Sequence, residues 1–380
     1  VMTSLTSSAV MMGLVNFVSG IPMLTLTLVG GLVADWLDRR RILIATQVLQ
    51  IFLAATLGWL VARDLVRVWH IVAVAFLLGV SAAFEMPAAA ALVPELVPRN
   101  EVAAAIAVDR SIFHGTRLIG PALGGYAVAR FGAASAFFLN ALSFFALIIA
   151  LLTIRIRPAQ GAEEKKALGG IREGLEYVRS DPLTLGMIAL MASATLFLFP
   201  VMAVMLPLYA RQELNLGADR MGFLMGISGL GSFTGSVGLL AIPKPKRRKL
   251  MLCAVGLAST ALGVLALARV FPVAAGSIAA LTLGSSLMIG LANTVIQERA
   301  PSQIRGRVSS VAGLSFFGLM PFASLGVTSM ADIIGMRVSL LLAAALFLLT
   351  GTLILLIARD QTSIPGVNHH NLRSNPASLK

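Results

Sequence analysis

The chain has 380 residues, of which 57% are hydrophobic and only 12% charged, and its formal net charge is +13. Soluble domains carry about a quarter charged residues, so this composition, with a mean hydropathy of +0.89, excludes an ordinary soluble protein and indicates a protein embedded in a bilayer. The single cysteine, Cys253, excludes an internal disulfide and a multi-thiolate metal site, and we expect neither a metal nor a cofactor.

Eleven apolar runs are long enough to cross a bilayer as helices. In chain order they cover residues 8–33, 42–62, 70–93, 102–129, 134–154, 183–210, 221–242, 250–268, 271–297, 308–330 and 338–358. The sequence has no His-Glu-x-x-His, no nucleophile signature and no Gly-x-x-x-x-Gly-Lys-(Ser/Thr) loop. We therefore expect neither an enzyme nor an ATP-driven pump.

The basic residues lie in the hydrophilic breaks between these runs. If alternate loops lie on opposite sides, most of the 30 Lys and Arg residues share a side with the break after residue 33, the central loop and the C-terminal tail. The positive-inside rule makes that side cytoplasmic and predicts a multi-pass protein of the plasma (inner) membrane with a cytoplasmic C-terminus. This placement explains the positive charge without a nucleic-acid partner.

The longest internal polar segment divides the predicted spans into five and six. We predict an N-terminal helical bundle over residues 1–156, a cytoplasmic central loop over 157–182, a six-helix bundle over 183–358 and a cytoplasmic tail over 359–380. The first bundle is shorter by about one spanning helix, which indicates that its first helix is missing. In the loop, Ile171, Leu175 and Val178 have the spacing of an amphipathic surface helix, although a plain linker is the alternative.

A charged motif follows the first span. It consists of Gly31, Asp35, Asp38, Arg39, Arg40 and Arg41. Gly31 allows another helix to approach closely, and Asp35 can pair with an arginine or with the positive N-terminus of a helix. Such contacts can latch one conformation; alternatively, the arginines only anchor the topology.

This motif resembles the loop signature of the major facilitator superfamily, Gly-x-x-x-Asp-(Arg/Lys)-x-Gly-(Arg/Lys)-Arg, with Trp36 and Asp38 as departures. The Asp-Arg-Arg-Arg ending resembles the drug and siderophore exporter branch, the transmembrane secretion effector type. The resemblance covers nearly the whole chain, including residues 87–98 and 297–308. It implies an all-α fold of two six-helix halves in one monomer, with eleven helices present of twelve.

The resemblance also implies a role for the charged motif. In that family the first loop contacts the start of the eleventh helix, which begins near Arg307 in this sequence. Carried over, Asp35, Arg39 and Arg40 would form a latch of the cytoplasmic gate.

The fourth span is interrupted by Gly120, Pro121, Gly124 and Gly125. Proline removes an internal hydrogen bond and glycines four apart leave a groove, so we expect a bend and a closely packed neighbour; plain small-residue packing is the alternative. Together with Arg117, the string resembles the superfamily's antiporter signature, Gly-x-x-x-Gly-Pro-x-x-Gly-Gly. That resemblance implies export and not uptake.

Ionisable residues inside predicted spans each cost about 2.5–3.5 kcal/mol on insertion scales and so mark a pathway or a pair. Glu85, Asp109 and Arg110 are all roughly 12–14 Å from the same cytoplasmic boundary. We expect them to meet between adjacent spans, and Glu85 or Asp109 to exchange a proton during transport. A permanent ion pair that only joins two helices is the alternative.

We expect a largely apolar substrate cavity, because Met and Phe side chains adapt to varied amphipathic ligands. The candidate walls are Phe113, Phe197, Phe199, Met202, Met205, Phe316, Phe317 and Met320, and Asn16, Asn140 and Asn293 are candidate polar contacts. The sequence thus predicts secondary active export of a small amphipathic molecule, drug-like or siderophore-like, by alternating access and proton antiport, with membrane lipid around the protein. A lysophospholipid or other lipid transporter and an inactive truncated transporter are the alternatives.

Overall fold

A computed structural model describes residues 2–6, 8–92, 95–98, 101, 105, 108, 112, 116, 120, 123–154, 167–239, 246–301 and 304–360. Over these residues the chain is helical and has no strand, so the predicted all-α fold class is confirmed there. The elements in chain order are α1 (Met2–Leu5), α2 (Ala9–Trp36), α3 (Arg39–Ala62), α4 (Val68–Leu92), α6 (Ala133–Thr153), α7 (Ala167–Ser180), α8 (Pro182–Phe197), the π-helix η3 (Val201–Met205), α9 (Leu206–Gln212), α10 (Ala218–Gly238), α11 (Arg247–Leu267), α12 (Phe271–Arg299), α13 (Arg305–Phe317), α14 (Met320–Ile334) and α15 (Met336–Asp360).

Nine segments of this described part are long and apolar enough to cross a membrane, not the eleven predicted. Two runs account for the difference. The run 221–242 coincides with α10, which is helical but so rich in glycine and serine that it is less apolar than the nine. The run 102–129 falls largely outside the described residues. The chain is a multi-pass membrane protein.

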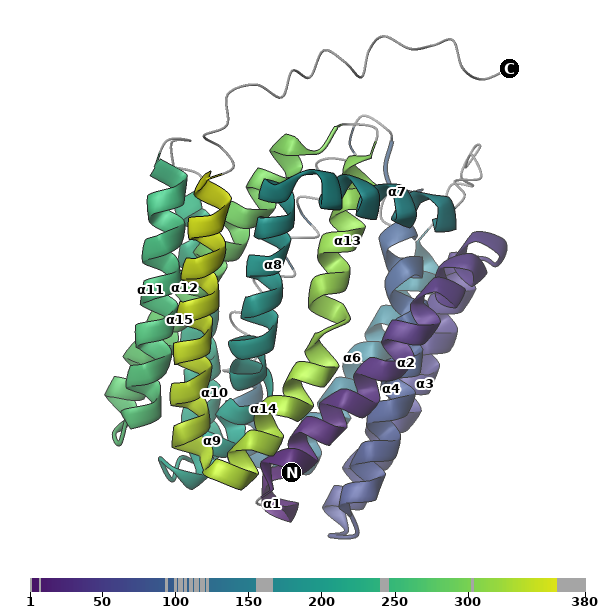
Figure 1. Ribbon diagram of the computed structural model, residues 1–380. Helices are drawn as coiled ribbons and strands as arrows, with labels where there is room; N and C mark the ends of the chain where they lie inside the picture. The colour runs from purple at the N-terminus through teal and green to yellow at the C-terminus, as the bar shows by residue number, and fades with distance from the viewer. Residues whose placement is uncertain are drawn as a thin grey trace, which may run out of the picture.

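The helices form two groups that stand side by side (Figure 1). Helices α2, α3, α4 and α6 pack mainly on one another, and α8 to α15 pack around the largest buried apolar cluster, which includes Leu190, Tyr209 and Phe347. We call the end of the molecule that holds α7 the α7 end and the opposite end, which holds α1, the α1 end (Figure 1).

The central loop contains a helix, α7, which contacts α13 and α8. The predicted apolar face is only partly correct. Val178 is buried, but Leu175 is exposed, and the side chain of Ile171 lies outside the described residues. A Cβ atom at Gly174 would lie 2.8 Å from the carbonyl oxygen of Arg307. The helix therefore packs directly on the protein, through a glycine that permits close approach.

Candidate functional site

Helices α2 and α14 join the two groups toward the α1 end. A Cβ atom at Gly13 would overlap the side chain of Thr328, and one at Gly20 would overlap the ring of Pro321. Small residues let membrane helices approach closely in this way. The two glycines thus allow α2 and α14 to pack without a gap.

A polar and an aromatic contact reinforce this seam. The hydroxyl of Ser324 donates to Asn16 Oδ1 at 3.3 Å. The rings of Phe17 and Phe322 meet edge to face with centroids 5.4 Å apart, an arrangement that aromatic rings prefer. Asn16, predicted as a ligand contact, therefore binds across the two groups; the other two predicted asparagines are exposed.

The seam ends at Asp332, near the last turn of α14. Its carboxylate accepts from Ser8 Oγ at 2.5 Å, from the backbone N–H of Ala9 at 2.8 Å and from that of Val10 at 3.2 Å. Ser8 Oγ in turn accepts from the N–H of Met11 at 3.4 Å. A side chain of one group thus completes the N-terminal cap of a helix in the other group. Sequence reasoning missed this residue.

Two of the membrane-spanning segments are broken near mid-length. Residues 198–200 separate α8 from η3, and residues 318–319 separate α13 from α14. Phe199, beside the first break, meets Phe316 edge to face at 4.8 Å, and Phe316 meets Phe317 at 5.1 Å. Broken helices and π-helical turns in membrane proteins recur at binding sites. This aromatic group is the candidate cargo site.

The other predicted cavity walls divide into three sets. Met205 is wrong as a wall, because it is fully buried in the core of the second group of helices. Phe113 lies outside the described residues. Half-buried side chains make up the remaining set: Phe197, Met202 and Met320.

Glu85 lies in a polar cluster between α3 and α4. Its carboxylate accepts from Gln47 Nε2 at 2.9 Å and from Gln50 Nε2. Gln50 Nε2 also donates to Ser81 Oγ at 3.0 Å. Gln47, Gln50 and Ser81 are buried, and Gln47 Oε1 has no hydrogen-bond partner among the described residues. A buried, unpaired amide oxygen is costly unless another state of the site uses it.

The predicted partners of Glu85, Asp109 and Arg110, lie outside the described residues. The two glutamines were missed, although they lie three residues apart and so on one face of the predicted span. A cavity of about 400 Å³ adjoins the cluster, and its lining includes Ser81 and, at the α7 end, Asp38 and Arg41.

The charged motif stays within the first group of helices. Arg39 pairs with Glu95 and donates to the carbonyl of Ala34 at 3.3 Å, and Arg40 donates to the carbonyl of Leu152. Asp38 caps α3 by accepting from the N–H of Arg40 at 2.9 Å. Arg41 lies 3.8 Å from Asp38 and is exposed. The side chain of Asp35 lies outside the described residues.

The close helix approach expected at Gly31 occurs instead at its neighbour. A Cβ atom at Gly31 would meet no described atom within 4 Å, whereas one at Gly30 would overlap the backbone of Ala83 in α4. One residue turns the helix face by about 100°. The sequence therefore identified the right element but the wrong face.

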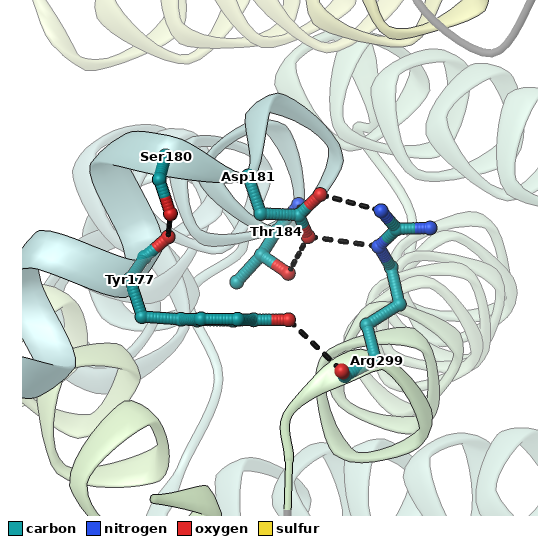
Figure 2. A network of polar contacts seen from close by, with 5 residues as sticks. All are labelled: Tyr177, Ser180, Asp181, Thr184 and Arg299. Atoms are coloured by element: carbon teal, nitrogen blue, oxygen red, sulfur yellow. Dashed lines mark hydrogen bonds and ion pairs between the residues drawn. The ribbon is translucent and has the colours of Figure 1, made fainter. Parts of the chain in front are cut away.

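At the α7 end of the second group, Asp181 and Arg299 fasten α7 to α12 (Figure 2). The carboxylate accepts from Arg299 Nε at 2.8 Å and Nη2 at 2.5 Å, and it caps α8 by accepting from the N–H and hydroxyl of Thr184. The hydroxyl of Tyr177 donates to the carbonyl of Arg299 at 2.9 Å. Burial alone would raise the pKa of Asp181, but the bonds from Arg299 and Thr184 outweigh it and lower that pKa below its ordinary value.

Arg307, at the start of α13, pairs with Glu173 of α7. Among the described side chains, Arg39 and Arg40 bind partners other than Arg307; because the side chain of Asp35 lies outside them, the gate latch stays a prediction. Burial, followed by the charge of Asp181, raises the pKa of Tyr177, which remains a neutral hydrogen-bond donor at ordinary pH.

The antiporter-like motif is only partly described. Arg117 and Pro121 lie outside the described residues. Cβ atoms at Gly120 and Gly124 would meet nothing within 4 Å among the residues that the structure describes. The bend expected at Pro121 lies outside the described residues, so the role of the motif, Gly125 included, stays a prediction.

Comparison with known proteins gives concordant results. The family described as "Transmembrane secretion effector" matches residues 1–375. The multidrug efflux pump Tap of Mycolicibacterium fortuitum is 26% identical over 365 residues, which cover 93% of this chain and 88% of that protein. The staphyloferrin A transporter of Staphylococcus aureus is 24% identical over 335 residues, covering 86% and 82%.

A solved structure has the same fold. It is a bacterial homolog of the human lysosomal transporter Spinster in an inward-facing and occupied conformation, and it aligns with a TM-score of 0.68 at 14% identity, covering 99% of this chain and 92% of that one.

Proposed function

Because the chain belongs to the transmembrane secretion effector family of the major facilitator superfamily, we propose that it exports small amphipathic molecules, drug-like or siderophore-like, by alternating access coupled to proton entry. It acts as a monomer in the plasma membrane, with two helical bundles, eleven spans of a twelve-helix fold and a cytoplasmic C-terminus. The α7 end then faces the cytoplasm.

One observation carries this proposal: the two groups of helices are sealed together on one side of the membrane. In the described residues, the hydrogen bonds and the ring contact between the groups lie along α2 and α14 and end at Asp332, near the α1 end. Toward the α7 end, Arg39 and Arg307 bind partners other than each other. This arrangement supports a state that is closed to the outside and receives cargo from the cytoplasm.

The aromatic group at the helix breaks supports an amphipathic cargo. Phe199, Phe316 and Phe317 offer ring edges and faces at mid-depth without a fixed charge nearby on their own segments. Such aromatic surfaces bind apolar ligands of varied shape. The names of two relatives, a multidrug efflux pump and a staphyloferrin A transporter, support the same two classes of cargo.

The cluster around Glu85 supports a proton site. When ionised, Glu85 accepts from Gln47 and Gln50. When protonated, its hydroxyl needs an acceptor, and the unpartnered Gln47 Oε1 supplies one after a rotation of the amide. The cavity beside Ser81 extends from this cluster toward Asp38 and Arg41 at the α7 end. Both protonation states of Glu85 can therefore be satisfied, with Asp109 and Arg110 as further members of the site.

The remaining motifs take roles in the conformational change. When the cytoplasmic side closes, Asp35, Arg39 and Arg40 approach the start of α13 and form the gate latch. We expect the span 102–129 to bend at Gly120, Pro121, Gly124 and Gly125, with Arg117 as the charged member of the same motif.

Reconstitution in liposomes tests the proposal. Protein in vesicles with an imposed pH gradient is expected to move ethidium or a labelled macrolide against the proton flow, and to stop when the gradient is collapsed. Movement of a labelled lysophospholipid alone would favour lipid transport. Absence of gradient-dependent movement of all three probes, with protein that is folded and inserted, would refute export.

A further inference from the structure

We propose that Asp332 is a positioning residue that latches the outer gate shut and releases it when protonated from outside. The proposal rests on alternating access in the proposed function, but not on the identity of the cargo or on the role of Glu85. The proposal gives a function to the hydrogen bond between Ser8 and Asp332, which lie 324 positions apart in the sequence.

The geometry of the contact is that of a helix cap shared between two bundles. Asp332 on α14 accepts from the N–H groups of Ala9 and Val10 and from Ser8 Oγ, while Ser8 itself caps Met11. When α2 and α14 separate, the first two N–H groups of α2 lose their protein acceptor. A carboxylate at a helix N-terminus also interacts with the positive end of the helix dipole. The contact therefore favours the closed outer gate and only that state.

Closure of the rest of the seam does not depend on charge. Gly13 and Gly20 provide close packing, and Phe17 provides an aromatic contact. Within the described part of the seam, Asp332 is the one ionisable side chain that bonds across the two groups. Asp332 is exposed, so protons of the outer medium reach it. Its protonation removes the charge and one acceptor position, and so weakens the cap.

The other charged groups near this end have partners of their own or lie on other elements. In α1, in the first turns of α2 and in η3, the described residues include no charged side chain. On α9 and α15, Arg337 Nε donates to Glu213 Oε2 at 2.8 Å, and Arg211 adds a further charge. On the α4 side lie Arg67 and His70, where His70 Nδ1 accepts from the N–H of Arg67 at 3.0 Å.

Distance measurements between the two bundles test the latch. In a Cys253→Ser background, spin labels at Leu65 and Val270 report the separation of the outer loops of the first and second bundles; both residues are more than half exposed. Asp332→Asn keeps the shape of the side chain and removes its charge. We expect it to raise the ratio of open to closed outer gates by about two- to fivefold, the range of a lost charge at a helix N-terminus.

The matched control is Asp219→Asn. Asp219 is an acidic residue in the first turn of α10 at the same end of the protein, within the second bundle. This control is expected to leave the distance distribution unchanged. Lowering the outer pH from about 7 to about 3, below the ordinary range of a carboxyl group, should open the gate in the wild type and in Asp219→Asn, but not further in Asp332→Asn. His70→Gln should retain the response to pH, which separates Asp332 from the nearby histidine.

Three results would overturn the latch: an unchanged distribution in Asp332→Asn, an equal change in Asp219→Asn, or a response to pH that survives in Asp332→Asn. A folding defect is recognised because it would also broaden distances within one bundle, between labels at Leu65 and Leu96. If cargo transport fails in liposomes but the outer-loop distance still responds to pH and to Asp332→Asn, the proposed cargo or coupling is refuted and the latch is not.

Discussion

Replacing Asp181 by alanine is expected to loosen α7 from the end of α12. The substitution removes an N-cap of α8, worth about 1 kcal/mol. It also removes a bidentate ion pair with Arg299. Solvent weakens this pair only in part, because the side chain of Arg299 is 42% exposed but that of Asp181 only 12%, so the pair contributes about 1–2 kcal/mol. The sum of about 2–3 kcal/mol corresponds to about 30- to 150-fold more frequent local opening.

Hydrogen exchange measured by mass spectrometry in lipid nanodiscs follows this opening directly. Peptides from α7 and from the first turn of α8 should exchange faster in Asp181→Ala, while α11 peptides serve as an internal reference. Glu176→Gln is the control, because its pair with Arg172 is exposed on both sides and contributes at most about 0.5 kcal/mol. Equal exchange in Asp181→Ala and Glu176→Gln would refute the reasoning that the Asp181 network holds α7.

The same network predicts a dependence on pH. The pKa of Asp181 is lower in the folded protein than its ordinary value of 3.8, so the ionised carboxylate stabilises the docked α7. This contribution is fully present above pH 3.8 and is lost as the pH falls through the lowered pKa. Exchange of α7, corrected for its intrinsic pH dependence, should therefore stay constant from neutral pH to about pH 4 and rise below it; a rise already near pH 6 would contradict this assignment.

The remaining predictions concern transport. Glu85→Gln should reduce transport driven by a pH gradient at least about tenfold while cargo still binds, measured in liposomes against Glu176→Gln; unimpaired transport would remove Glu85 from coupling. Phe316→Ala should weaken cargo binding about fivefold through the loss of an aromatic contact, measured by quenching of a fluorescent cargo, and unchanged affinity would exclude the aromatic group as the site. Gly20→Leu should clash with Pro321 and shift the outer-loop distance toward the open gate; an unaltered distance would show that the seam does not control the gate.

The spans were largely predictable because bilayer thickness imposes a run length that hydropathy reads directly. The second predicted span, expected from residue 42, in fact begins at Arg39, because Asp38 caps the helix and the three arginines form its first turn. Helix α10 was also expected, from the run 221–242, although its glycines and serines leave it less apolar than the nine candidate spans of the described residues. The break at residues 198–200 was not predicted, because an uninterrupted apolar run gives no sign of a π-helical turn.

The sites were less predictable, because they depend on contacts between distant segments. The depth of Glu85 indicated a functional group, but only the packing of α3 on α4 identifies Gln47 and Gln50 as its partners. Asp332 lies just beyond the predicted end of its span, and nothing in the local sequence connects it to Ala9. The shift of the close contact from Gly31 to Gly30 has the same cause, because periodicity fixes a helix but not its rotation.

In the proposed mechanism, the two bundles open alternately to the two sides of the membrane. Paired distance measurements in one liposome preparation test it directly, with labels at Leu65 and Val270 for the α1 end and at Leu96 and Lys246 for the α7 end. We predict that cargo and an imposed pH gradient lengthen the first distance and shorten the second in the same molecules. Two distances that lengthen together, or that do not respond to either condition, would contradict alternating access.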